Sequence, residues 1–551
     1  MGAGPLIPGL TVASILSLGI AAVLVYIVRP LLFSPLSKIP TAHPTSRFCW
    51  LWIYYIRWAG LENTTLYHLH QAKGPILRLG PNELSINCYD EGVKTIYIGG
   101  FDKPEYYFNR FSAYGAANMV SMMHSKEHSV RRRMFANVFS KSKIFSCPSL
   151  RASATTIIFE RLLPVFSSAA KAGRPVEIHS LTCAYALDLL QAYQFGMSLG
   201  SDFLRNRQTR EWHLSQYFAR IPHLFWISEF PTLVSVSGWL GMGIVPQHVT
   251  AARTGLEAWF LNKCDAAERL MATELELRVE DIPIVYVQGR RAFAKADQEF
   301  DEGERLPAGA NQPQSASHRL EIASDMLDFN AATLETSGDA LVYIYYELSR
   351  HRDMQERLRQ ELHTLSPSMS CDPSDQTCAS QPPALPDPKD VDELPLLDAI
   401  IQETLRLYPA AEGGQPRVTP SPPCSLAGFE NIPPGVRVQS SAYSLHRNPD
   451  VFPEPEAWRP ARWLDASPAQ RVEMKRWFWA FGSGSRMCIG NHLARYSIKY
   501  AVAAIYSNFT SGLEKKDFAS PVVKADGSAV GERHNLYLRF RRVDHDCESM
   551  N

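Results

Sequence analysis

The sequence predicts a mainly α-helical protein with a minor β part, in which one large domain follows a single N-terminal transmembrane helix. Three observations lead to this fold class. The 551 residues are 45% hydrophobic and 11% aromatic, which suits a sizeable core and excludes a largely disordered chain. From about residue 120 the apolar residues recur mostly at helical spacing, and Ile322 to about Leu365 continues this pattern without a proline. Strand signals are confined to a pair of segments between Ile76 and Ile86 and to the region of Asn535 to Leu538.

The N-terminal segment has the length of a membrane span. Leu6 to Val28 contains no charged residue, and 23 residues at about 1.5 Å each reach about 35 Å, enough to cross a bilayer core. We therefore expect residues 1–30 to be a membrane anchor. A cleaved signal peptide is the alternative, but no basic residue precedes the run and the run is long for a signal peptide. The first charges, Arg29 and Lys38, follow it and place the body on the cytosolic side.

Prolines divide the rest of the chain. Residues 31–45 contain three prolines directly after Pro30, and this density predicts a semi-rigid hinge before a body that spans 46–551. Residues 366–388 are polar and proline-rich, which predicts an exposed loop insertion within that body.

Charge and cysteine content exclude two classes of protein. Lys plus Arg and Asp plus Glu both number 56, so no bulk charge favours nucleic acid as a partner. The ten cysteines form no regular CxxC pairs and do not make a disulfide scaffold. The simplest interpretation is a set of reduced thiols in a protein that faces the cytosol.

The segment from Phe481 to Gly490, FGSGSRMCIG, carries the chemistry. It is a glycine-rich loop that delivers Cys488 to the start of an apolar helix. Backbone N–H groups at that helix start would bind a sulfur anion and lower the pKa of the thiol. Phe481 can shield the sulfur from water, and Arg486 can pair with a carboxylate of a cofactor. A lone cysteine is usually a structural one, but here every fixed position of FxxGxRxCxG is matched.

This loop resembles the haem-binding loop of the cytochrome P-450 superfamily, and the resemblance extends over nearly the whole chain. It implies a cytochrome P-450 fold with residues 46–551 as a haem-thiolate catalytic domain. It implies haem b (iron protoporphyrin IX) as the cofactor, with Cys488 as the metal ligand. A thiolate ligand increases electron density at the iron and favours O–O cleavage.

A second motif lies upstream, at Glu403 and Arg406. Residues three apart on a helix face the same way, and the apolar residues around them predict a buried pair. A buried ion pair needs further partners to offset its loss of hydration. The segment Pro460-Ala461-Arg462-Trp463 is similar to the family's PERF segment, so the resemblance implies that Arg462 completes a structural Glu-Arg-Arg cluster.

A third motif lies in the proline-free helical stretch. Ala332 and Thr336 are one turn apart and share a face, which leaves room for a diatomic ligand beside a hydroxyl. A threonine within a helix more often bonds its own i−4 carbonyl. The stretch is similar to the family's AGx(D/E)TT motif, which implies that Thr336 and Glu335 are catalytic and supply protons during oxygen activation. The departures are Thr333, where the family usually has glycine, and Ser337.

Three further residues match positions that contact the haem propionates in the family. His128 and Arg132 lie one turn apart in a segment similar to the family's W/HxxxR helix. Arg417 fits a strand position that also reaches a propionate. Arginine clusters are by default solvated faces, so these roles are implied by the resemblance alone.

The resemblance implies a monooxygenase that hydroxylates or otherwise oxidises a hydrophobic small molecule with O2. The chain shows no flavin or nicotinamide domain, so we expect electrons from an NADPH–cytochrome P-450 reductase, with cytochrome b5 as a second donor. Candidate docking charges on the thiolate side are Arg131, Arg133, Lys475 and Arg476. The expected location is the endoplasmic reticulum membrane, single-pass, with the catalytic domain in the cytosol.

Anchor, hinge and loop style look most like fungal members that tailor secondary metabolites, so a terpenoid, a polyketide or an alkaloid would fit as substrate. Two alternatives stay open. One is a haem-thiolate isomerase or dehydratase that needs no O2, a class that tends to lose the acid–alcohol pair found here at Glu335 and Thr336. The other is a catalytically silent membrane haem-binding protein, which the three intact motifs disfavour.

Overall fold

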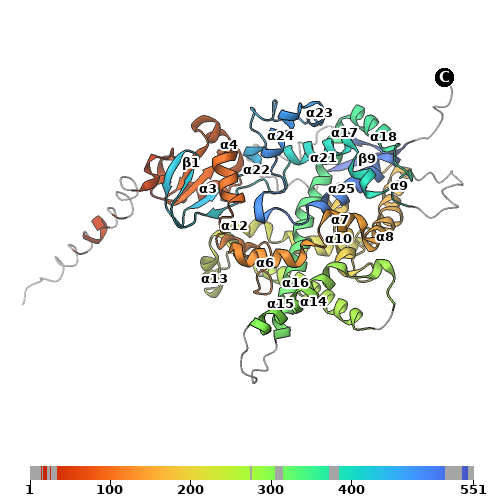
Figure 1. Ribbon diagram of the computed structural model, residues 1–551, viewed down its shortest axis with the longest axis horizontal. Coiled ribbons are helices and arrows are strands. Elements are labelled where there is room, and N and C mark those ends of the chain that lie inside the picture. Colours follow the sequence, from red (N-terminus) through yellow and green to blue (C-terminus); the bar gives the residue numbers. More distant parts are fainter. Residues whose placement is uncertain are drawn as a thin grey trace, which may run out of the picture.

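The computed structural model describes residues 34–273, 276–303, 314–370, 384–514 and 536–543, together with positions 14, 17–21 and 25. These residues form a mainly helical body with three small sheets, which confirms the predicted fold class for this part of the chain. Figure 1 shows the largest sheet, with α3 (Leu51–Trp58) and α4 (Glu62–Lys73), at one end of the body, while helices make up most of the rest.

The largest sheet joins two distant parts of the sequence. Its strand order is β1 (Ile76–Gly80), β2 (Glu83–Ile86), β7 (Arg437–Gln439) and β4 (Arg417–Val418). The first two strands form the predicted antiparallel pair, β7 runs parallel to β2, and β4 is antiparallel to β7. The smaller sheets are β5 (Cys424–Leu426) with β6 (Phe429–Ile432), and β3 (Val176–Glu177) with β9 (Tyr537–Arg542) and β8 (Phe509–Leu513).

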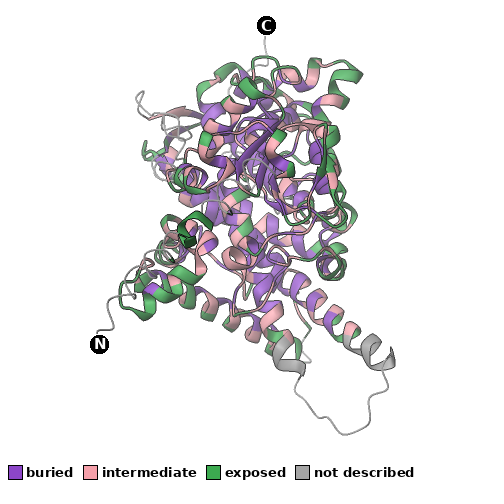
Figure 2. Ribbon diagram, turned by 90° about the vertical axis from the view of Figure 1, so that its left-hand side faces the viewer, coloured by how far each residue is buried: buried purple, intermediate pink, exposed green. Residues whose placement is uncertain are grey.

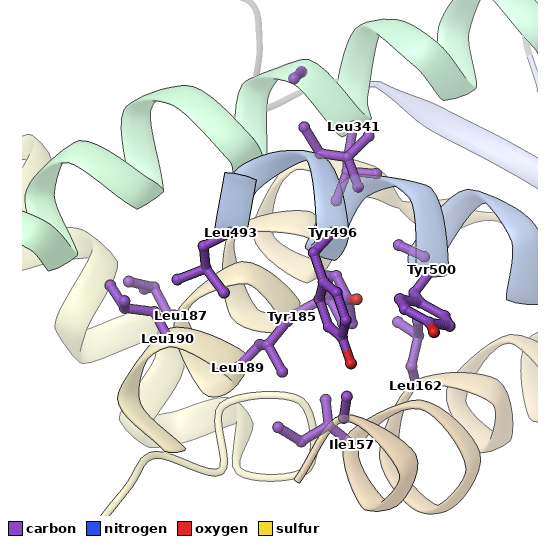
Figure 3. Close-up of a cluster of buried hydrophobic side chains, with 14 of the residues drawn as sticks. Ile157, Leu162, Tyr185, Leu187, Leu189, Leu190, Leu341, Leu493, Tyr496 and Tyr500 are labelled. Atoms are coloured by element: carbon purple, nitrogen blue, oxygen red, sulfur yellow. The ribbon is translucent and has the colours of Figure 1, made fainter. Parts of the chain in front are cut away.

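The helical part is built around α10 (Ile178–Phe195), in which every residue except Ser180 is buried. Figure 3 shows Tyr185, Leu189 and neighbouring α10 side chains packed against Tyr496 and Tyr500 of α25 (Asn491–Asn508) and Leu341 of α17 (Asp339–Arg350). Figure 2 shows buried residues running through the interior of the body and exposed ones at its rim. A helix that is buried on all sides is stable only within such a core.

The remaining helices cover this core. The α-helices are α5 (Tyr106–Phe111), α6 (Ser125–Ala136), α7 (Lys141–Ser146), α8 (Pro148–Thr156), α9 (Leu163–Lys171), α11 (Arg207–Phe218), α12 (Leu224–Glu229), α13 (Pro231–Trp239), α14 (Gln247–Met271), α15 (Ile284–Gly303), α16 (Gln314–Thr333), α18 (Arg352–Leu362), α20 (Pro388–Asp392), α21 (Pro395–Leu407), α22 (Ala442–Leu445), α23 (Ala461–Asp465) and α24 (Pro468–Trp477). Short 3₁₀ and π segments are η2 (Pro35–Lys38), η3 (Pro44–Arg47), η4 (Tyr89–Ile98), η5 (Ile157–Leu162), η6 (Ile221–His223), η7 (Val279–Asp281), η8 (Leu334–Gly338) and η9 (Gly484–Arg486).

The proline-free stretch from Ile322 to Leu365 is not one uninterrupted α-helix. The wide π turn η8 separates α16 from α17, and the helix ends at His351, which leaves helical backbone angles (φ −118°, ψ 81°). The His351 Nδ1 lies 2.8 Å from the carbonyl of Glu347, so the ring can satisfy a group that a continuing helix would use. Local side-chain bonding, rather than a proline, therefore ends this helix.

The described part of the predicted hinge, residues 34–45, packs against the body. Leu36 and Ile39 are buried, because they are apolar residues spaced to face the sheet between the prolines. The Arg78 N–H donates to the Pro40 carbonyl at 2.8 Å, and Ala42 N–H donates to the Arg78 carbonyl at 2.9 Å. The segment thus lies along the outer strand β1.

Two other predicted segments lie largely outside the described residues. The expected anchor, 1–30, is described at only a few positions, and no helix among the described residues is long and apolar enough to cross a membrane. In the loop insertion 366–388, residues 371–383 are outside the described part. Its described ends are partly exposed, as predicted at residues 366–368. Met369 and Leu385 are buried, and the Tyr500 hydroxyl donates to the Pro386 carbonyl at 2.7 Å.

Candidate haem site around Cys488

Cys488 ends a loop that its own backbone holds in shape. The Cys488 N–H donates to the Phe481 carbonyl at 2.9 Å, and the Asn491 side chain donates to the Cys488 carbonyl at 2.8 Å. Gly484 has a positive φ of 71°, and a Cβ there would lie 2.2 Å from the carbonyl oxygen of Tyr97. The loop therefore turns tightly against η4 and needs glycine at this position.

The Cys488 side chain is exposed, and the other residues of the loop are exposed or half-buried. Burial raises the pKa of the Cys488 thiol, while a hydrogen bond from the Gly490 backbone and the positive charge of Arg132 lower it. In the protein alone the net shift of the Cys488 pKa is upward, because burial outweighs these two groups. A metal ion on the sulfur would deprotonate it outright.

Phe481 and Arg486, the two other residues predicted from this loop, contact neighbouring elements. The Phe481 ring is half-buried, and the Arg495 guanidinium of α25 lies 5.2 Å from its centroid. Arg486 donates to the carbonyls of Met122 and Met123 at 2.7 and 2.6 Å. The loop is thus fastened to the segment before α6.

A relay of hydrogen bonds supports the loop from behind. The main-chain N–H of Trp479 donates to His446 Nε2 at 2.6 Å, and His446 Nδ1 lies 2.9 Å from the Arg406 carbonyl. Burial lowers the pKa of His446 to about 3, and the charges of Arg406 and Arg447 add to this, although the bond to the Arg406 carbonyl opposes it. The ring is therefore neutral, with Nδ1–H donating and Nε2 accepting. The sequence analysis missed His446 and Trp479, because no local pattern distinguishes them from other buried rings.

The relay begins at the predicted Glu-Arg-Arg cluster, which the structure confirms. The fully buried Glu403 carboxylate accepts from Arg406 Nε and NH2 and from Arg462 Nε, each at 2.9 Å. The Arg459 N–H and the Trp463 indole N–H, at 2.9 and 3.0 Å, complete its shell. Five donors offset the hydration that this charge gives up on burial.

The residues expected to hold the propionates form a cluster of positive charge. His128 and Arg417 are buried, Arg132 donates to the Met487 carbonyl at 2.6 Å, and Arg417 donates to the Tyr107 hydroxyl at 2.9 Å. Burial lowers the pKa of His128 to about 3, and Arg486 is the largest of the like charges that add to this shift. Their hydrogen bonds reach carbonyl and hydroxyl oxygens, which do not neutralise the charge.

Lys103 is a further member of this cluster that sequence reasoning missed. It is buried and donates to the Val120 carbonyl at 2.6 Å, with its ammonium 4.3 Å from the Tyr107 ring centroid. Burial, and then the charges of Arg417 and Arg486, hold the pKa of Lys103 well below its usual value. A lysine after an aspartate in an irregular segment carries no signal of its own, so only its position reveals it.

The donor set of this cluster fits a group that carries two carboxylates. Buried like charges are costly unless a counter-charge joins them. Two buried donors here, His128 Nδ1 and Arg486 Nε, have no hydrogen-bond partner among the described residues. His128, Arg132, Arg417, Arg486 and Lys103 would hold the propionates of haem b, and Cys488 would hold its iron.

The wide turn η8 presents the predicted oxygen-activation residues. Ala332 and Thr336 are exposed on one face, whereas Leu334 and Ser337 are buried and Thr333 is half-buried. Among the described residues the Thr336 hydroxyl has no hydrogen-bond partner, so it is not bonded to its i−4 carbonyl. Wide π turns inside α-helices are frequent at functional sites. This hydroxyl is therefore available to another group.

Glu335, unlike Thr336, has a side-chain partner. Its carboxylate lies 3.9 Å from the Arg220 guanidinium, which donates to the Tyr217 hydroxyl at 2.7 Å. The acid of the predicted pair is thus tied to the end of α11.

One predicted docking charge is wrong. Arg131 is buried and bonds Asp325 at 2.7 Å and Glu321, so it cannot meet a protein partner. His128 and Phe135 lie on the same face of α6 as Arg131, and this whole face is buried. Arg476 bonds Asp90 at 2.7 Å and Glu473 at 2.8 Å, while Arg133 and Lys475 are exposed.

Comparisons with known proteins show what this chain is similar to. The family model for cytochrome P-450 matches residues 287–534. A cytochrome P-450 monooxygenase of Aspergillus versicolor is 28% identical over 441 residues, covering 77% of this chain and 92% of the relative. One of Sordaria araneosa is 26% identical over 511 residues, covering 91% and 92%. One of Annulohypoxylon moriforme is 26% identical over 500 residues, covering 88% and 91%.

The neutral His446 ring predicts a pH dependence of stability. Its pKa is depressed in the folded state, so its stabilising contribution is present above about 6.5 and is lost as the pH falls towards 3. At pH 5 this loss is about 2 kcal/mol.

His446→Gln keeps one donor and one acceptor but cannot titrate. We expect it to lower the melting temperature at pH 7.5 and to flatten the decrease between pH 7.5 and 5. His68→Gln, at an exposed histidine, is the control, and equal slopes in all three proteins would contradict the assignment.

Proposed function

We propose that this chain, which is similar to cytochrome P-450 monooxygenases over most of its length, is a haem-dependent monooxygenase of that family. On this proposal it oxidises a hydrophobic small molecule with electrons from an NADPH–cytochrome P-450 reductase. We further propose cytochrome b5 as a second donor and the cytosolic side of the endoplasmic reticulum membrane as its location. The relatives are fungal monooxygenases, which supports a role in secondary metabolism with a terpenoid, polyketide or alkaloid as substrate.

The solvent-accessible Cys488 thiol beside the cluster of buried cations carries the proposal. A bound haem supplies oxygen activation, and a thiolate ligand favours O–O cleavage. The protein itself positions the Cys488 sulfur. Arg132 places its charge beside Cys488 and bonds the neighbouring Met487 carbonyl, and the His446 relay fixes the loop from behind.

Thr336 and Glu335 support a monooxygenase over an isomerase or dehydratase. The unbonded Thr336 hydroxyl can donate its proton and recover one from water or a nearby acid. The Glu335 side chain is 30% exposed, so its carboxylate can exchange protons with solvent. An isomerase or dehydratase that does not activate O2 needs neither an unbonded hydroxyl nor a solvent-accessible carboxylate at these positions. The same intact residues argue against a catalytically silent haem-binding protein.

An apolar face supports contact with a membrane. It consists of Leu51, Tyr55 and Trp58 on α3 and Leu233, Val236 and Trp239 on α13, all of them exposed. The two helices are linked, since the Tyr54 and Phe230 rings lie 4.9 Å apart. Large apolar patches on a soluble surface mark sites of interaction, and aromatic residues favour the membrane interface. We propose that this face rests on the bilayer to which residues 1–30 anchor the chain.

Replacing Cys488 tests the haem-thiolate assignment. Cys488→Ala should abolish the thiolate signature in the carbon monoxide difference spectrum of the reduced protein, because no other ligand supplies the same electron density. Cys424→Ala, at a half-buried cysteine of β5, should keep it. A thiolate signature retained in Cys488→Ala would overturn the assignment.

Replacing Thr336 tests the role of its hydroxyl. Thr336→Ala should lower the product formed per NADPH by about tenfold or more and release hydrogen peroxide instead, because proton delivery loses its selectivity. The substrate for this test would come from comparing the metabolites of the source organism with and without the gene. Thr333→Ala is the control. If the product formed per NADPH were unchanged in Thr336→Ala, proton delivery would be assigned to Thr333 or Ser337 instead.

Charges placed in the apolar face test the membrane contact. In protein lacking residues 1–30, Leu51→Glu with Trp239→Glu should reduce binding to phosphatidylcholine vesicles by about tenfold or more, because carboxylates are costly in the bilayer interface. Val472→Glu on α24, also exposed, should bind as the truncated parent does. Equal sedimentation of all three proteins with vesicles, at equal haem content, would rule out the contact.

A further inference from the structure

Three buried side chains lie behind the wide turn η8, on the side away from Thr336. His179 and Cys183 come from α10 and are one turn apart, and Asp339 is the first residue of α17. All three are at most 3% exposed. They touch both the start and the end of the wide turn.

The backbones of α10 and η8 meet at a glycine. A Cβ at Gly338 would lie 2.9 Å from Cys183 Sγ and 3.3 Å from Cys183 Cα. A real Cβ atom does not approach another atom that closely, so any side chain at 338 would push the two helices apart. The absence of a side chain therefore lets α10 touch the last residue of the turn directly.

At the start of the turn, Cys183 reaches a backbone carbonyl. A π turn contains one more residue than an α-helical turn, and this displaces the regular hydrogen bonds of the helix. The Cys183 Sγ lies 4.0 Å from the Leu334 carbonyl oxygen, within reach of a weak S–H···O bond. Burial raises the pKa of the Cys183 thiol, while the neighbouring His179 lowers it.

At the end of the turn, an ion pair holds Asp339. The His179 Nε2 lies 3.4 Å from Asp339 Oδ1 and 3.7 Å from Cys183 Sγ. Burial opposes the charged ring, but Cys183 and Asp339 outweigh it and raise the pKa of His179 to about 10. The raised pKa favours the charged form of the His179 ring beside the Asp339 carboxylate. Removing one partner of such a pair leaves a buried charge without its counter-charge.

The helix that supplies these contacts is itself immobilised. The buried residues of α10 pack on η5, α17 and α25 (Figure 3). Its His179 ring lies 5.5 Å from the Phe218 ring at the end of α11, next to the Tyr217 hydroxyl that Arg220 bonds. The support for the turn and the partner of Glu335 are thus in contact.

We propose that His179, Cys183 and Asp339 are positioning residues that hold η8 as a wide turn and so keep the Thr336 hydroxyl free of its own helix. The shape of the turn determines whether the Thr336 hydroxyl can reach its own helix. If residues 334–338 relaxed into a regular α-helix, Thr336 Oγ1 would come within reach of the Ala332 carbonyl, the usual partner of a helical threonine. The functional part of this inference depends on the role proposed for Thr336.

Two substitutions on different helices test the proposal in the haem-loaded enzyme. Cys183→Ala removes the sulfur between Leu334 and Gly338, and Asp339→Asn removes the charge that pairs with His179. Cys264→Ala is the matched control, because Cys264 is also a buried cysteine and lies on α14, away from η8. The measurements are hydrogen exchange of the amides in 334–340, the melting temperature, and the hydrogen peroxide formed per NADPH.

We expect exchange in 334–340 to become about tenfold faster in both variants, because each removes an interaction at one end of the turn. Peroxide per NADPH should increase severalfold at equal haem content. Cys264→Ala should lower the melting temperature without either change. If Asp339→Asn does not fold, Cys183→Ala alone decides.

A purely structural role would give a different result. The proposal would be overturned if amide exchange in 334–340 increased only in proportion to the loss of melting temperature, as it does in Cys264→Ala. Faster local exchange without added peroxide would also overturn it, provided that Thr336→Ala does release peroxide. If Thr336→Ala releases none, the proposed function of Thr336 is wrong, and the exchange data alone decide whether these residues hold the turn.

Discussion

The buried carboxylate of Glu403 is the constraint on which the site depends. It is fully enclosed, and five donors from α21, α23 and the segment before α23 converge on its two oxygens. A buried charge is tolerable only with such a complete set of partners, and loss of one partner costs about 3–5 kcal/mol. Arg406 extends the network to His446, and His446 accepts from Trp479 at the base of the cysteine loop. The position of Cys488 is therefore set by contacts made far behind it.

The positive charges near Cys488, in contrast, are not paired with carboxylates by hydrogen bonds in the described part of the chain. The negative charge of Glu403 is matched within the chain, whereas Lys103, Arg417 and Arg486 are gathered with hydrogen bonds to neutral oxygens only. Matched buried charges stabilise the fold. Unmatched ones of one sign raise its free energy until a ligand of the other sign arrives. This contrast separates the structural cluster from the cofactor-binding one more clearly than residue type does, since both are rich in arginine.

The oxygen-activation segment shows how one helix can serve two purposes. Its buried side, from Leu334 to Asp339, packs on α10, and its exposed side carries Ala332 and Thr336. The wide turn changes the helical phase between these two sides. A regular helix would satisfy its own polar groups and leave the threonine hydroxyl occupied. The strict α-helical spacing used to interpret the sequence describes the exposed face correctly but contains no sign of the wide turn.

The sequence alone determined the chemistry that neighbouring residues encode. The glycine loop at Cys488 and the Glu403–Arg406 pair each lie within a few positions, where loop glycines and helical geometry set the arrangement. Only the tertiary structure decided the rest. It added Lys103 and His446 to the site, buried Arg131, and packed the described part of the hinge against β1. The physical reason is that burial and charge summation come from elements hundreds of residues apart, such as Lys103 and Arg417. Their distance in space is set by the packing of the whole chain and not by any local pattern.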